Sequence, residues 1–121
     1  MKGRSLRDQH PPPPLLSDAM GIILHAGDAR NYAKQAREAM REMNFTEARS
    51  LLETAKKEIA EAHRAQTEII QNEARGICYE YSMLFNHAQD TLMTINSEIE
   101  LTADLILTFE VVMRKLTEKE G

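Results

Sequence analysis

The tetrapeptide His87-Ala88-Gln89-Asp90 places an imidazole, an amide and a carboxylate within about one turn of a predicted helix. Free histidine titrates close to neutral pH, so a large fraction of its imidazole is uncharged under physiological conditions. A neutral imidazole nitrogen can attack phosphorus. The residue types therefore indicate reversible phosphorylation of His87, although a lone histidine on a helix surface is more often inert than reactive.

A phosphoryl group on His87 would need hydrogen-bond donors from side chains or from another subunit, because the amides of a helix interior are used within the helix. Gln89 offers an NH2 group and Thr91 a hydroxyl, two neutral donors with the moderate hold that a carrier requires. Three apolar residues flank this set: Met83, Leu84 and Met93. A partner protein could dock on them and exclude water. For Leu84, an ordinary place in the core is the better expectation.

The carboxylate of Asp90 needs a different explanation, because a negative charge beside a phosphoryl group repels it. If the third helices of several subunits meet around a symmetry axis, one Asp90 from each subunit converges there. Like charges in a partly buried place require a cation or protonation, and oxygen ligands favour a hard ion such as Mg²⁺. A solvated carboxylate that contacts His87 one turn away explains Asp90 equally well, so both interpretations stand.

Two further histidines, His25 and His63, are predicted to make structural hydrogen bonds. Neither has a histidine or carboxylate at the i, i+4 spacing expected of a zinc site on a helix. Cys78 is the only cysteine, which excludes an internal disulfide and a cysteine metal site and favours a reducing compartment.

The composition is typical of an all-α protein, since aromatic residues make up 5% of the chain and tryptophan is absent. An apolar stripe from Met20 to Met40 predicts a first helix, with Ser17 or Asp18 as its N-cap. Many members of this stripe are alanines, which permit close approach of a neighbouring helix.

A second helix is predicted to begin at Phe45, because Asn44 stands three residues before Glu47 in a spacing like that of a capping box. The short connection requires the first two helices to be antiparallel. Gly76 ends the second helix, and residues 77–116 contain no further glycine or proline and predict one long third helix.

The third helix carries a heptad pattern of apolar residues whose only polar member is Thr102. Its members are Tyr81, Phe85, Ala88, Leu92, Ile95, Ile99, Thr102, Ile106, Phe109, Met113 and Leu116. Further apolar residues lie beside this seam, more than two shorter helices would cover. The expected architecture is an antiparallel three-helix bundle whose third helix partly overhangs the others and also faces other subunits.

Charge is distributed unevenly along the chain. Residues 1–16 carry a net charge of +2 and include the run Pro11–Pro14, which predicts a flexible, proline-rich arm. The remainder carries −6, which argues against nucleic-acid binding, and residues 17–118 are expected to form the single domain. No apolar run approaches the ~20 residues of a membrane span, so a cytoplasmic protein is expected.

Three segments in this order resemble the lactose/cellobiose-type enzyme IIA of the bacterial phosphoenolpyruvate-dependent sugar phosphotransferase system. They are GIILHAGDAR (residues 21–30), AHRAQT (62–67) continued by IQNEARG (70–76), and NHAQDTLMT (86–94). The resemblance covers about residues 19 to 116. It departs from the family pattern at Thr91, where many members have histidine, at Asn86, where they have an aliphatic residue, and at Met43-Asn44, where they have Gly-Asp.

The resemblance implies a homotrimeric phosphotransferase component in which His87 accepts a phosphoryl group from the phosphocarrier HPr and passes it to a IIB protein. It implies that the three Asp90 carboxylates bind a metal, usually taken to be Mg²⁺, on the trimer axis. The sugar would be a β-glucoside or disaccharide of the lactose, cellobiose or chitobiose type. The alternative is a non-catalytic trimeric adaptor that binds partners through the heptads of the third helix.

Overall fold

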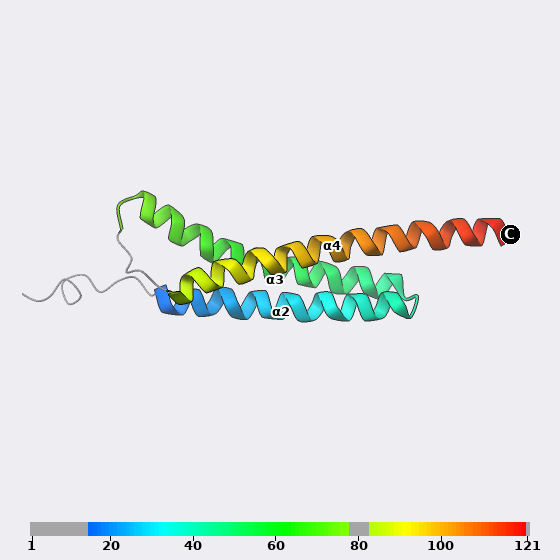
Figure 1. The fold of residues 1–121 in the computed structure, drawn as a ribbon, viewed down its shortest axis with the longest axis horizontal. Helices are drawn as coiled ribbons and strands as arrows, with labels where there is room; N and C mark the ends of the chain where they lie inside the picture. The colour runs from blue at the N-terminus through cyan, green and yellow to red at the C-terminus, as the bar shows by residue number, and fades with distance from the viewer. Residues whose placement is uncertain (1–14, 78–82, 121) are drawn as a thin grey trace, which may run out of the picture.

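The computed structural model describes residues 15–77 and 83–120, and this part of the chain forms three α-helices and no strands. Helix α2 spans Leu15–Arg41, α3 spans Phe45–Ala74 and α4 spans Met83–Glu120. The helices α2 and α3 are antiparallel, and α4 runs back along both in the direction of α2 (Figure 1). The all-α, three-helix prediction with a long third helix is therefore confirmed for the single chain.

The ends of the helices differ in part from the predictions. Because α2 begins at Leu15, Ser17 and Asp18 lie in its first turn, and the prediction that one of them is the N-cap is wrong. Ile77 is not helical, so the start of the third helix expected there is also wrong. Residues 1–14 of the predicted arm, Cys78 and Tyr81 lie outside the described residues. None of the described helices is long and apolar enough to cross a membrane.

The start of α3 confirms the capping prediction. The side chain of Asn44 accepts a hydrogen bond from the backbone N–H of Glu47 at 3.2 Å. The amide nitrogen of Asn44 also donates to the carboxylate of Glu47 at 3.2 Å. These bonds satisfy one of the amides that a helix leaves without a partner at its first turn, which fixes where α3 begins.

The C-terminal ends of α2 and α3 share one hydrogen-bond pattern with different residues at its critical position. At the end of α2, Met43 has a φ of 64° and its N–H donates to the carbonyl of Met40, while the N–H of Asn44 donates to Ala39. At the end of α3, Gly76 has a φ of 95° and the same pair of bonds is made by Gly76 and Ile77. Both ends therefore require a left-handed residue, which glycine adopts without strain and methionine does not.

Met43→Gly is expected to raise the free energy of unfolding by about 1 kcal/mol, because it removes the cost of a left-handed residue with a Cβ atom. Little packing is lost, since Met43 is half exposed. Chemical denaturation with urea measures the change. The reverse substitution, Gly76→Ala, should cost a similar amount, because a Cβ there meets no atom within 4 Å and the penalty is purely one of backbone conformation. Equal stability of wild type and Met43→Gly would contradict this account.

The core between the helices is built largely from alanine. Six residues of α2 have no exposed surface, and five of them are alanines: Ala19, Ile22, Ala26, Ala29, Ala33 and Ala36. Three alanines of α3 are equally buried: Ala48, Ala55 and Ala62. Larger side chains come from α4, where Leu92, Ile95, Ile99 and Ile106 fill the remaining space. Small residues on α2 and α3 let the helix backbones approach closely, as the sequence predicts.

The one polar residue of the heptad seam, Thr102, is 1% exposed and fully paired. Its hydroxyl donates to the carbonyl of Glu98 at 2.8 Å and accepts from the guanidinium of Arg37 on α2 at 2.8 Å. A buried hydroxyl without such partners would destabilise the fold. The residue thus carries a specific contact between α2 and α4.

The seam is buried only as far as Ile106. Phe109 and Leu116, which continue the heptad pattern, are 46% and 49% exposed. Arg49, in the second turn of α3, is paired with Glu110 of α4. The C-terminal end of α4 extends beyond the connection between α2 and α3 (Figure 1). We call residues 111–120, which follow this pair in α4, the overhang. The predicted overhang is therefore present in the single chain.

Candidate functional site

His87 lies in the second turn of α4 and its side chain is exposed. The described part of the chain supplies no hydrogen-bond partner for it. Among residues 83–97 of α4, Asp90 is the only one with a formal charge at neutral pH when His87 is uncharged. His87 is thus an accessible imidazole on a helix segment that offers no cation to an attached phosphoryl group.

Gln89 does not share the face of His87. Residues two apart on a helix are separated by about 200° around its axis. The half-buried side chain of Gln89 instead meets α3, where Nε2 of Gln66 donates to its Oε1 at 3.1 Å. The structure brings Gln89 together with Gln66 and not with His87 of the same chain.

The other residues singled out in the sequence lie at different depths. Asp90 is exposed and Thr91 is half-buried, each about one turn after His87. Met83, one turn before His87, is 76% exposed, and Met93 is also exposed. Leu84 packs against the core, as expected. Met83 is therefore the apolar neighbour of His87 that remains accessible to a partner.

The two competing histidines differ from each other. Nδ1 of His25 on α2 lies 2.8 Å from the carboxylate oxygen Oε2 of Glu58 on α3, so the prediction of a structural hydrogen bond is confirmed for this histidine. His63 is half-buried and makes no hydrogen bond within the described part of the chain. The prediction therefore holds for His25 alone.

Two arginines on α2 hold the middle of α4. Arg30 donates two hydrogen bonds to the carboxylate of Glu98, at 2.9 and 2.7 Å. These bonds lower the pKa of Glu98 below its ordinary value. The positive charges of Arg30 and Arg37 lower this pKa further, by a smaller amount. Near the start of α2, the pKa of Asp18 is raised, chiefly by partial burial and to a smaller extent by the negative charge of Glu68 on α3. Paired charges thus fix the position of α4, while acidic groups lie near the start of α2.

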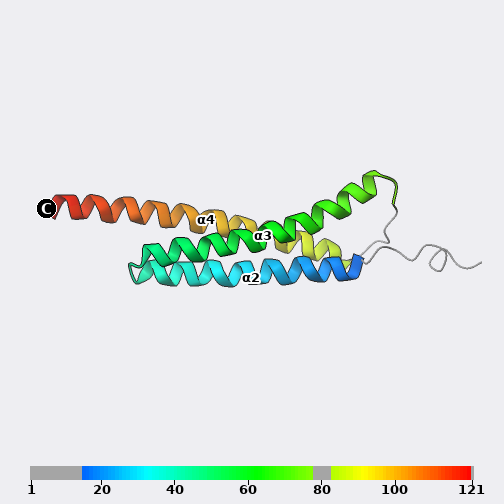
Figure 2. The ribbon, with the colours of Figure 1, turned by 180° about the vertical axis from the view of Figure 1, so that it is seen from behind.

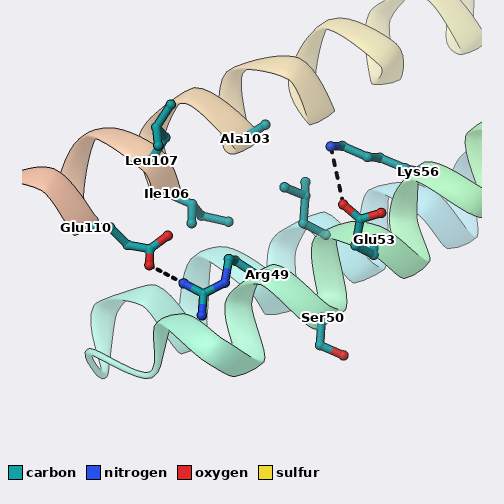
Figure 3. A pocket seen from close by; sticks show the side chains of 9 residues that line it. Arg49, Ser50, Glu53, Lys56, Ala103, Ile106, Leu107 and Glu110 are labelled. Atoms are coloured by element: carbon teal, nitrogen blue, oxygen red, sulfur yellow. Dashed lines mark hydrogen bonds and ion pairs between the residues drawn. The ribbon is translucent and has the colours of Figure 1, made fainter.

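A groove between α3 and α4 lies away from His87. It is lined by Arg49, Ser50, Leu52, Glu53, Lys56, Ala103, Ile106, Leu107 and Glu110 (Figure 3). Its cations are already neutralised, because Arg49 pairs with Glu110 and Lys56 lies 3.5 Å from the carboxylate of Glu53. The groove therefore lacks a free charge for an anion and is not the place of the predicted chemistry.

The described helices contain no group of three or more His, Cys, Asp or Glu side chains that could hold a metal ion. The one feature near His87 that the sequence analysis missed is the bond between Gln66 and Gln89. Gln66 stands in a segment that carries the family resemblance, three residues after His63. This position does not show which residue of α4 lies opposite Gln66.

Comparisons with known proteins agree with this geometry. A family model described as the PTS system lactose/cellobiose-specific IIA subunit matches residues 17–110. The lichenan-specific phosphotransferase enzyme IIA component of Bacillus subtilis is 41% identical over 100 residues, which is 83% of this chain and 87% of the relative. The lactose-specific EIIA component of Lacticaseibacillus casei is 35% identical over 99 residues, 82% of this chain and 88% of the relative.

A solved structure shows the same fold. The cellobiose-specific enzyme IIA from Bacillus anthracis matches with a TM-score of 0.79 and 37% identity, covering 85% of this chain and 94% of that one. Fold and site together define an all-helical component of a sugar phosphotransferase system. The chain belongs to the lactose/cellobiose-specific IIA family of that system.

Proposed function

We propose that this protein carries phosphoryl groups in a sugar phosphotransferase system, accepting them on His87 from HPr and passing them to a IIB component. The observation that carries the proposal is an exposed His87, free of hydrogen bonds within the described residues, in the segment that resembles the family. The relatives are named for lichenan, lactose and cellobiose, which favours a β-glucoside or disaccharide as the sugar. The protein acts in the cytoplasm.

The transfer is an in-line exchange between two histidines. A neutral nitrogen of His87 forms a bond to phosphorus while the bond from phosphorus to the HPr histidine breaks, and the HPr imidazole leaves with the electron pair. The second transfer repeats this step with His87 as the leaving group. Positioning and exclusion of water contribute most, because little acid-base chemistry is needed. The adaptable side chain of Met83 supplies part of the apolar surface on which HPr and IIB dock.

Donors to the phosphoryl group come from Thr91 on the same helix and from Gln89. Because Gln89 faces away from His87 of its own chain, its NH2 group serves the phosphoryl group on a neighbouring copy. This arrangement requires an oligomer. The exposed heptad residues beyond Ile106 favour a homotrimer, in which the third helices cover one another.

In the homotrimer, three Asp90 carboxylates meet on the axis and hold Mg²⁺. The residues fit this role only as a set from three copies, because one chain brings a single exposed carboxylate to the place and an oxygen ligand suits a hard cation. When bound, the ion would neutralise the gathered carboxylates. The Asp90 side chains would then hold the three copies in register.

Removal of Mg²⁺ is expected to weaken the assembly of wild type, and Asp90→Leu should make assembly insensitive to Mg²⁺ because the repelling carboxylates are gone. Sedimentation velocity with and without EDTA measures both effects. Asp28→Leu, an exposed aspartate of α2, is the matched control and should keep the wild-type response. A wild-type protein that sediments as a monomer at all concentrations with Mg²⁺ present would refute the trimer.

Incubation with phosphoenolpyruvate, enzyme I and HPr tests the carrier function. Intact mass should show a gain of one phosphate that is lost on brief acid treatment, because phosphohistidine is acid-labile. No gain with an active donor system would favour the second candidate, a non-catalytic helical adaptor. The exposed Phe109, Val112 and Leu116 of α4 suit that role as well.

A further inference from the structure

The hydrogen bond between Gln66 and Gln89 fixes the orientation of a planar amide. Nε2 of Gln66 on α3 donates to Oε1 of Gln89 on α4, and both side chains are half-buried. An amide carries its acceptor and its donors on opposite branches, so an engaged oxygen turns the NH2 group away from Gln66. No acceptor for this NH2 group lies within the described part of the chain. Gln89 is therefore held with a free donor.

We infer that Gln66 is a positioning residue, which keeps Gln89 turned so that its NH2 group, and not its oxygen, is presented to the phosphoryl group. The inference deepens the proposed carrier function and rests on it. Gln66 itself touches neither phosphate nor partner in this account. It acts through Gln89, and it comes from a different helix than the other residues of the site.

The hydrogen bond between Gln66 and Gln89 lies close to the region where α3 separates from α4. The last turns of α3 diverge from α2 and α4, as both views show (Figures 1 and 2). The ion pair of Arg49 and Glu110 joins α3 to the C-terminal half of α4. The hydrogen bond from Gln66 joins α3 to the second turn of α4. A side chain from α3 thus fixes an amide two residues from His87, close to the region where the two helices part.

The direction of the bond can be reversed by an isosteric change. Gln66→Glu replaces the donor with a carboxylate that can only accept, so the NH2 group of Gln89 would turn towards residue 66 and its oxygen towards the phosphoryl group. Two oxygens facing each other repel. Gln66→Met removes the bond without reversing it and leaves the amide free to rotate. The expected order of phosphorylation rates is wild type, then Gln66→Met, then Gln66→Glu.

The experiment measures phosphoryl transfer from phosphorylated HPr at increasing HPr concentration, together with the lifetime of the phosphorylated protein. Gln66→Glu should lower the rate at saturating HPr about tenfold, since a positioned donor to the phosphoryl oxygens is lost, with KM for HPr unchanged. Gln71→Glu is the matched control, because it adds the same charge at an exposed position of α3. It should behave as wild type.

A purely structural role would predict a lower melting temperature for Gln66→Glu with wild-type transfer at saturating HPr, and that result overturns the inference. The side-chain ¹⁵N resonance of Gln89 provides a separate readout, since reversal of the bond must shift it. An unshifted resonance in Gln66→Glu also overturns the inference. Absence of any phosphate on the wild-type protein, with the resonance shifted, would instead refute the carrier function while confirming the orientation.

Discussion

His87→Ala is expected to abolish uptake of phosphate from HPr. The substitution removes the only imidazole in the described part of α4, and no other side chain there is a nitrogen nucleophile of similar reactivity. Intact mass after incubation with phosphoenolpyruvate, enzyme I and HPr should show no acid-labile gain. Helix content should not change, because the side chain is exposed and makes no hydrogen bond within the described residues.

Two controls make this result specific. His63→Ala removes a half-buried histidine of α3 that has no assigned role, and it should take up phosphate as wild type does. His25→Ala breaks the bond to Glu58 and should lower stability without preventing phosphorylation. Uptake of a phosphate by His87→Ala would end the assignment of the nucleophile. A loss in all three variants would point to a general effect of the substitutions.

Ala55→Leu is expected to lower the free energy of unfolding by about 2–3 kcal/mol. Ala55 has no exposed surface and lies in a core where small residues bring the helices together. Three extra heavy atoms cannot be accommodated there without moving a helix or forcing strained rotamers. Chemical denaturation, followed by circular dichroism, gives the change.

The control for this substitution lies on the same helix. Ala60 of α3 is exposed, so Ala60→Leu adds the same atoms with the same change in helix propensity and should alter stability by no more than about 0.5 kcal/mol. The difference between the two variants isolates the effect of close helix approach. If Ala55→Leu were as stable as Ala60→Leu, the core would have space for a larger side chain at position 55, which would contradict the close packing described above.

Local signals in the sequence predicted the helices well. The spacing of Asn44 and Glu47 located the start of α3, and the heptad pattern of α4 identified the buried residues from Ala88 to Ile106. These predictions succeeded because capping and amphipathic periodicity depend on neighbours along one helix. The start of α2 was missed by three to four residues, because the helix already includes Leu15 and Leu16 and has no cap at Ser17 or Asp18.

Patterns along a single helix did not predict the contacts between helices. Thr102 stood out as a polar member of an apolar seam, but its partner Arg37 is 65 residues away. Likewise, nothing in the spacing of α3 paired Gln66 with Gln89. The left-handed turn at Met43 was missed because the residue that usually marks it, glycine, is absent there. Long-range pairing depends on the relative rotation of whole helices, which no short motif encodes.

The overhang of α4 connects the proposed assembly to local stability. Val112 and Leu116 of this segment are 44% and 49% exposed in the single chain. In the proposed homotrimer another copy would cover these side chains, and stabilisation by association grows with the logarithm of protein concentration. The stability of the last turns of α4 would therefore depend on protein concentration more than the stability of the alanine core does.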